Sequence, residues 1–299
     1  MKKAHCIIAL ALPFIFGLGW IFGKAALDHF PPILMAALRF GTAGLIMLPF
    51  VEWPKIKLHH LILLSALAIG IPYSLSNYGL SKLDVSTTVL LVQLEAPFLI
   101  MMSLLFLRER PSGILIIGVT ISFFGVILVA GTPVFEGNSG AVTLTIMSMI
   151  IWSTGQLMIR KIGAISSFSL LGALSCLAAP QLIVFSFFFQ EEQMQAIQTA
   201  TSSNWMQIIY LGLVMTVSGV GIWYFLISRY AISLVAPFLM LVPAVSVVGS
   251  IFLLHEAPST MTIIGGLIIS LGVALSTTFK FNRHPKQVVT VGDRNELDM

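Results

Sequence analysis

The sequence predicts an all-α membrane protein whose ten transmembrane helices form two inverted five-helix repeats. Three observations predict this fold class: an apolar composition, a division into runs of membrane-spanning length, and an internal repeat. Of the 299 residues, 57% are hydrophobic and only 9% are charged, whereas soluble domains are about 25% charged. Lipid is therefore expected to be the main solvent of the chain.

Ten segments are long and apolar enough to cross a bilayer, which takes about 20 residues. Proline, glycine and charged residues separate them, and the first is interpreted as a span and not a cleaved signal peptide, because nine more follow. The polar residues 281–299 are predicted to form a disordered cytoplasmic tail. The predicted spans are 5–27, 31–51, 61–81, 86–107, 111–131, 140–160, 166–189, 204–227, 232–254 and 258–279.

The basic residues predict the orientation of the chain. Short cytoplasmic loops are rich in Lys and Arg. If the N-terminus is cytoplasmic, Lys82 is the only Lys or Arg outside the spans that lies on the outer side of the membrane. We therefore expect a protein of the bacterial inner membrane with both termini in the cytoplasm. The residues assigned to the cytoplasmic side are Lys2, Lys3, Lys55, Lys57, Arg108, Arg110, Arg160, Lys161, Arg229, Lys280, Arg283, Lys286 and Arg294.

An internal repeat appears when residues 81–125 are moved forward by 147 positions. Glu109 then lies over Glu256, and Gly118 and Gly125 lie over two further glycines, Gly265 and Gly272. A shift of 132 lays Trp20 over Trp152. Because five is an odd number of spans, the second copy must enter the membrane in the opposite direction, as in many transporters. The predicted divisions are 1–133 for the first repeat, 134–280 for the second and 281–299 for the tail.

Four sequence motifs are spread over nearly the whole chain. They are Trp20 to Lys24, Pro31-Pro32 followed by Ala37-Leu38-Arg39-Phe40, Trp152-Ser153-Thr154-Gly155-Gln156, and the run from Gly219 to Glu256. With these motifs the chain resembles the EamA family of the drug/metabolite transporter superfamily, and the last motif looks especially like the cysteine and O-acetylserine exporter type of that family. The resemblance implies ten helices, two EamA repeats and, in many members, export of amino acids or related metabolites.

The residues argue against an enzyme and against a nucleic-acid binder. We find no nucleophile with a base, no paired carboxylates at helical spacing, no metal-ligand cluster and no phosphate-binding loop. Cys6 and Cys176 both lie in apolar stretches, and the basic residues form no patch. We expect no cofactor and no metal. The expected partners are a small-molecule substrate and the lipid bilayer, with the chain as a monomer or a homodimer.

Two ionisable residues near the middle of predicted spans are candidates for substrate binding. Buried membrane charges cost about 2.5–3.5 kcal/mol and usually pair or face a cavity, so Arg39 and Glu95 are natural partners. They form a structural salt bridge, or Arg39 receives a substrate carboxylate while Glu95 binds an ammonium group or a coupling proton. Lys24, nearer the membrane surface, is either a substrate-site residue or a snorkelling anchor.

Other polar and aromatic residues inside the spans are candidates for lining a cavity, which needs apolar walls and a few polar groups. Packing and interhelical hydrogen bonds are the alternative explanation. Prolines in the fourth and ninth spans remove a backbone hydrogen bond and are hinge candidates. The cavity candidates are Trp20, Tyr73, Asn77, Tyr78, Gln93, Trp152, Gln156, Trp223 and Tyr224, and the hinge candidates are Pro97 and Pro243.

The sequence thus predicts a secondary-active transporter that exports amino acids or related small metabolites by proton coupling or exchange. Import or exchange of another metabolite, such as a nucleotide-like cofactor or a carboxylate, is the alternative on the same fold. A channel, or a membrane scaffold that transports nothing, is the alternative class.

Overall fold

The computed structural model describes residues 3–107, 113–130, 137–162, 166–227, 229–230, 238–239 and 241–278. Within these ranges the chain forms helices and no strand. The predicted tail, 281–299, lies outside the described residues, as do the matched Glu109 and, at the start of the ninth predicted span, residues 232–237 and 240.

The first half of the chain follows the predicted spans closely. The third span is continuous through three helical segments, α3, η2 and α4, and the fourth is divided into α5 and α6. The helices are α1 (Lys3–Leu27), α2 (Pro32–Met47) with a 3₁₀ turn η1 (Leu48–Phe50), α3 (Leu58–Ser65), η2 (Ala66–Gly70), α4 (Ile71–Lys82), α5 (Val85–Val92), α6 (Glu95–Leu107) and α7 (Gly113–Ala130).

The second half adds a short helix, α10, that the sequence did not predict, between the seventh and eighth spans. The eighth span is again continuous through three segments, α11, η4 and α12. The helices are α8 (Ser139–Ile162), α9 (Ser167–Phe189), α10 (Gln193–Thr199), α11 (Ser202–Ile209), η4 (Tyr210–Gly219), α12 (Val220–Ile227), α14 (Val242–Leu253) and α15 (Thr260–Thr278).

Six of the described helices are long and apolar enough to cross a membrane. Four shorter apolar helical segments lie where the remaining predicted spans are: Val85–Leu99, Ile116–Val129, Val242–Leu253 and Thr260–Leu275. An apolar helical membrane protein is therefore what the structure supports, and the count of ten spans stays a prediction.

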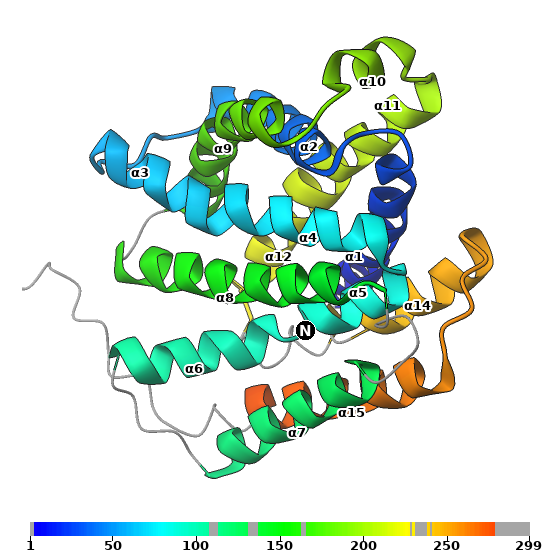
Figure 1. Ribbon diagram of the computed structural model, residues 1–299. Coiled ribbons are helices and arrows are strands. Elements are labelled where there is room, and N and C mark those ends of the chain that lie inside the picture. The colour runs from blue at the N-terminus through cyan, green and yellow to red at the C-terminus, as the bar shows by residue number, and fades with distance from the viewer. Residues whose placement is uncertain are drawn as a thin grey trace, which may run out of the picture.

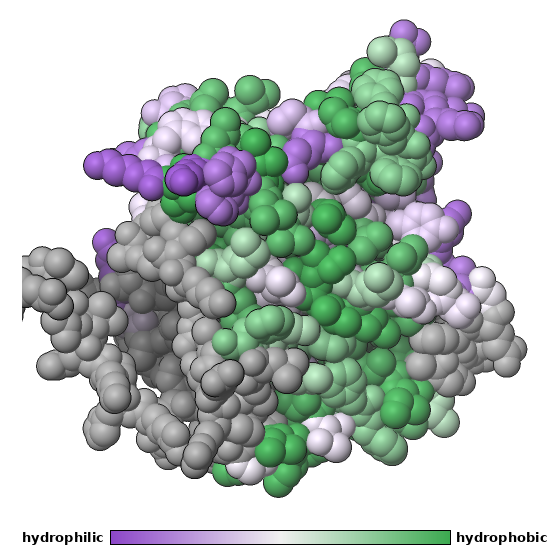
Figure 2. All heavy atoms as spheres, turned by 60° about the vertical axis from the view of Figure 1, so that its left-hand side comes forward, coloured by the Kyte–Doolittle hydropathy of each residue, from purple (hydrophilic) through white to green (hydrophobic). Residues whose placement is uncertain are grey.

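The helices form a bundle in which α4, α6, α7, α8 and α15 run roughly along one direction (Figure 1). Large apolar side chains face outward on many helices, among them Phe188 at 80% and Leu45 at 74% exposed. Figure 2 shows a broad hydrophobic surface with polar residues gathered toward its margins. An apolar surface of this extent is stable in lipid and would aggregate in water.

Glycines allow the closest helix contacts in the bundle. A Cβ added to Gly125 of α7 would lie 2.7 Å from the Gly265 carbonyl oxygen of α15, a distance that real Cβ atoms do not reach. A Cβ on Gly44 of α2 would lie 3.0 Å from the backbone nitrogen of Cys176 in α9. These small residues let backbones approach, which is how helices associate tightly in membranes.

The two proline hinge candidates lie in the first turn of a helix and not in its interior. The fourth span breaks at Gln93–Leu94, so Pro97 is the third residue of α6, and Pro243 is the second residue of α14. First-turn N–H groups have no partner within the helix, so proline costs no hydrogen bond there. In the fourth span Pro97 thus follows a break between two helices, and the hinge role of both prolines stays a prediction.

Candidate functional site

The candidate site centres on Arg39, which α2 holds in the interior with 8% of its surface exposed. Its Nε donates a hydrogen bond to Thr216 Oγ1 of η4 at 3.0 Å. Its guanidinium carbon lies 4.9 Å from the ring centroid of Tyr73 and 5.1 Å from that of Phe40. The two rings contact each other edge to face, with their centroids 4.7 Å apart. The cation therefore lies beside two neighbouring aromatic rings, which attract it.

A π-helical segment places the threonine that holds Arg39. Thr216 Oγ1 donates to the carbonyl oxygen of Leu211, five residues earlier, at 2.8 Å, so an oxygen lone pair remains for Arg39. Gly212 permits the approach, because a Cβ there would lie 2.9 Å from the Arg39 carbonyl oxygen. π-Helical turns inside helices often occur at functional sites, and the ten-residue segment η4 carries the hydroxyl that contacts α2 here.

Arg39 has no carboxylate partner among the described residues. None of their carboxylate oxygens lies within 4.0 Å of its nitrogens, and the expected pair with Glu95 does not form. Span depth was the basis for that pairing, and depth does not fix the direction in which a side chain points. A buried cation without a counter-ion is costly, so Arg39 is suited to receive an anionic group.

Glu95 lies at the break in the fourth span. It is the first residue of α6, half-buried, and its carbonyl oxygen accepts a hydrogen bond from Ser153 Oγ of α8 at 3.4 Å. The N-terminus of α6 favours its negative charge, and no cation of the described residues lies within 4.0 Å of its carboxylate. Glu95 and Arg39 are thus two separate charged positions.

Lys24 lies where α4 ends and α5 begins, together with Glu256, a carboxylate that the sequence matched only as a repeat position. Lys24 Nζ donates to the carbonyl oxygens of Leu80 and Leu83 at 2.8 and 2.9 Å, at the C-terminus of α4. Glu256 accepts from the Val85 N–H at 2.7 Å and from the Ser86 hydroxyl at 3.2 Å, at the N-terminus of α5. Each charge faces the helix end that stabilises it.

Asp84 lies between these two helix ends. Partial burial, and next the negative charge of Glu256, raise the pKa of the Asp84 carboxyl above its ordinary value of 3.8, and Lys24 opposes them. The sequence offered one signal for this cluster, the match of Glu256 in the repeat, but its contacts depend on chain segments 170 residues apart.

The other candidates are spread over the bundle. Asn77 is buried, and its Nδ2 donates to the Pro32 carbonyl oxygen at 3.2 Å. Trp20 packs on the cluster of Leu80, Val85 and Val89, and Trp223 packs on that of Ala9, Leu12 and Leu226. Gln93, Trp152 and Gln156 are half-buried, and the side chain of Tyr224 lies outside the described part. The structure thus brings Arg39 together with Tyr73, one of the cavity candidates, and with Thr216, which was not a candidate.

Comparison with known proteins now gives the family. The sequence model of the EamA-like transporter family matches residues 3–131 and, a second time, residues 139–278. The chain belongs to the EamA-like transporter family. As an EamA chain it is a membrane transporter and not an enzyme.

Relatives of this EamA chain include a probable efflux pump and an uncharacterized transporter. It is 25% identical to a "probable amino-acid metabolite efflux pump" of Escherichia coli, over 98% of this chain and 100% of that protein. It is 28% identical to the uncharacterized transporter YvbV of Bacillus subtilis, over 90% of each. A crystal structure with 15% identity matches with a TM-score of 0.62, over 95% of this chain and 100% of that chain, which shows a shared fold.

Proposed function

We propose that this EamA transporter exports amino acids or closely related metabolites across the bacterial inner membrane, with Arg39 binding the substrate carboxylate. The observation that carries the proposal is the buried guanidinium with no carboxylate within 4.0 Å among the described residues. Guanidinium is the side-chain group best matched to a planar carboxylate. The Escherichia coli relative is named a probable amino-acid metabolite efflux pump, which agrees with this substrate class.

The proposed mechanism is alternating access by two inverted repeats, 1–133 and 134–280, with both termini in the cytoplasm. Contacts between α7 and α15 support the symmetry. A Cβ on Gly125 would lie 2.7 Å from the Gly265 carbonyl oxygen, and a Cβ on Gly272 would lie 2.6 Å from that of Gly118. In the shift of 147 positions Gly118 corresponds to Gly265, and Gly125 corresponds to Gly272. The contact of Gly125 with Gly265 and the contact of Gly272 with Gly118 are therefore equivalent, as a two-fold axis between the two helices requires.

The matched helix irregularities support the same proposal. The helical part of the third span starts at Leu58, and that of the eighth span starts at Ser202. In each span the π-helical segment, η2 or η4, begins eight residues after that start. In the register of 147, the start of α6 at Glu95 corresponds to the start of α14 at Val242. Interrupted helices in corresponding positions of two halves are the usual surroundings of a transporter's substrate site.

Glu95 is the proposed coupling residue, either for a proton or for the substrate ammonium group. A carboxylate at a helix break inside the membrane can bind and release a cation as its exposure changes. Proton coupling predicts that an imposed pH gradient drives transport by the wild type and not by Glu95→Gln. Gradient-driven transport that persists in Glu95→Gln overturns the coupling role while leaving the Arg39 site in place.

The substrate proposal is tested by uptake into proteoliposomes of a labelled panel that includes cysteine and O-acetylserine, each compared with the amine that lacks its carboxylate. We expect saturable uptake of carboxylate-bearing solutes by wild type, loss in Arg39→Gln, and no uptake of the amines. Lys57→Gln, which removes an exposed positive charge, is the control and should behave as wild type. Uptake of the amines at the same rate, or normal uptake by Arg39→Gln, would contradict the proposal.

A further inference from the structure

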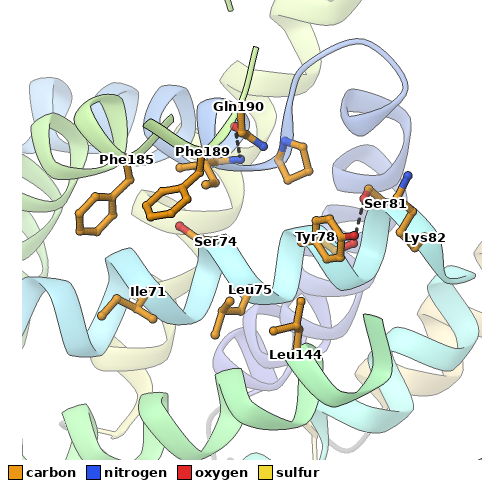
Figure 3. A pocket seen from close by; sticks show the side chains of 12 residues that line it. Ile71, Ser74, Leu75, Tyr78, Ser81, Lys82, Leu144, Phe185, Phe189 and Gln190 are labelled. Carbon is orange, nitrogen blue, oxygen red and sulfur yellow. Dashed lines mark hydrogen bonds between the residues drawn. The ribbon is translucent and has the colours of Figure 1, made fainter. Parts of the chain in front are cut away.

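A groove of about 620 Å³ opens among α2, α4, α8 and α9. Figure 3 shows Phe185 and Phe189 of α9 on one side of it, and Ile71 and Leu75 of α4 on the other. Leu144 of α8 completes the apolar wall. Phe189 is 77% exposed, so the groove is continuous with the hydrophobic surface.

One end of the groove is polar, where α4 ends and α2 begins. Ser81 and Lys82 line this end, and Gln190 lines the groove beside Phe189 (Figure 3). The Ser81 hydroxyl donates to the Tyr78 carbonyl oxygen at 2.8 Å, and Gln190 Oε1 accepts from the Ile33 N–H at 3.1 Å. The serine proton and the amide oxygen are therefore already in use within the protein.

Lys82 is the charged group at the polar end, and among the described residues its side chain has no hydrogen-bond partner. This side chain is exposed and makes no ion pair with any of those residues. The nearby charges are divided in sign: Lys24 repels it, while Glu256 is already engaged at the N-terminus of α5. Asp84, two residues further along the chain, interacts electrostatically with both Lys24 and Glu256.

We propose that this groove is a phospholipid site, with one acyl chain lying along the apolar walls and the phosphate beside Lys82. Apart from Ser74, Tyr78 and Gln190, the walls between the two ends are aliphatic and aromatic, which suits a hydrocarbon chain. Lys82, the cation among the lining residues, is the last residue of α4, and the end of a span is where lipid headgroups are expected. Anionic lipid is attracted by about 1 kcal/mol for each Lys near the membrane surface, so a phosphatidylglycerol headgroup fits this end.

This occupant follows from the surroundings of the groove. In a bilayer the exposed apolar surface that carries Phe189 is in contact with lipid tails, so an acyl chain is the apolar group already present at the groove. A cavity of this size lies within the roughly 300–1,000 Å³ range of ligand sites. The site is distinct from the proposed substrate site, because none of its lining residues contacts Arg39 or Thr216 through a hydrogen bond or ring contact.

The test is native mass spectrometry of the full chain during stepwise removal of phosphatidylglycerol in detergent. We expect one lipid to be retained by wild type after the others have gone. Leu75→Trp should fill the groove and lose this lipid. Lys82→Gln should weaken its retention about fivefold, and Lys82→Arg should keep it. The matched controls are Leu63→Trp, an exposed residue at 49% on the same span, and Lys57→Gln, and both should retain it.

Photocrosslinking keeps the test independent of the folding of any variant. Phosphatidylglycerol with a photoreactive acyl chain, added to wild type, should label α4 and α9 at the groove ahead of other membrane-facing helices. Labelling spread evenly over the exposed helices would overturn the proposal. Equal retention by wild type and folded Leu75→Trp would overturn it too, and so would unchanged retention by Lys82→Gln, because the headgroup contact is part of the site.

Discussion

At the scale of single residues, the functional assignment depends on how Arg39 is held. The hydroxyl of Thr216 and the rings of Tyr73 and Phe40 surround the guanidinium without neutralising it. The sequence singled out Arg39 because a charge in the middle of a span is rare. It could not reveal Thr216, since an ordinary threonine in an apolar helix gives no signal until the partner helix is placed beside it.

Thr216 should orient the guanidinium for substrate. Thr216→Val preserves the shape of the side chain but removes the hydrogen-bond acceptor at 3.0 Å from Nε. Loss of one hydrogen bond to a charged group costs about 1.5–3 kcal/mol, so the KM for the carboxylate substrate should rise at least about tenfold. Thr216→Ser should stay near wild type. Concentration-dependent uptake measures the difference, and equal KM values for Thr216→Val and wild type would remove Thr216 from the site.

Asp84 should make the stability of the protein depend on pH. Because burial and Glu256 raise the pKa of its carboxyl in the folded state, the folded protein binds this proton more tightly than the unfolded chain does. Stability from this group is therefore present near and below pH 3.8, its ordinary pKa, and is lost as the pH rises through the raised value. Asp84→Asn should flatten that dependence.

Thermal unfolding of wild type and Asp84→Asn in detergent across the acidic range measures this effect. The control Glu52→Gln removes an exposed carboxylate and should leave the wild-type profile. If Asp84→Asn and wild type have parallel profiles, Asp84 is not the group responsible.

At the scale of helices, apolar runs and punctuation predicted most boundaries to within a few residues, as for α8 and α15. Lipid demands helices for any spanning segment, so a long apolar run leaves the chain little choice. The division of the fourth span at Gln93–Leu94 and the π-helical segments were not predicted. They depend on which helix lies opposite, and hydropathy carries no information about that.

The close contact between α7 and α15 should make Gly125 intolerant of a methyl group. Gly125→Ala would place a Cβ 2.7 Å from the Gly265 carbonyl oxygen and 2.8 Å from the Ile269 backbone nitrogen, so the helices must separate. Overpacking of this kind costs about 1–3 kcal/mol. Gly221→Ala, in the interior of α12 with nothing within 4 Å of the added Cβ, is the matched control and should be neutral or slightly stabilising. Unfolding in increasing SDS compares the two variants, and equal losses would contradict the packing account.

At the scale of the whole molecule, the repeat in the sequence anticipated a structural pattern. The glycine matches at a shift of 147 recur as reciprocal contacts between α7 and α15, and the family model matches the chain twice. The expected Arg39–Glu95 pair is the main feature that failed, because both residues were placed by depth alone. Sequence gives depth along a helix well, and the direction of a side chain around it poorly.

Transport of a carboxylate-bearing solute is the central claim, and solute counterflow tests it most directly. Proteoliposomes loaded with unlabelled cysteine or O-acetylserine are diluted into a trace of the labelled solute, with no ion gradient. The account predicts a transient accumulation of label that saturates with internal solute and disappears in Arg39→Gln. Folded wild-type protein that gives no accumulation with any carboxylate-bearing solute of the panel would contradict it.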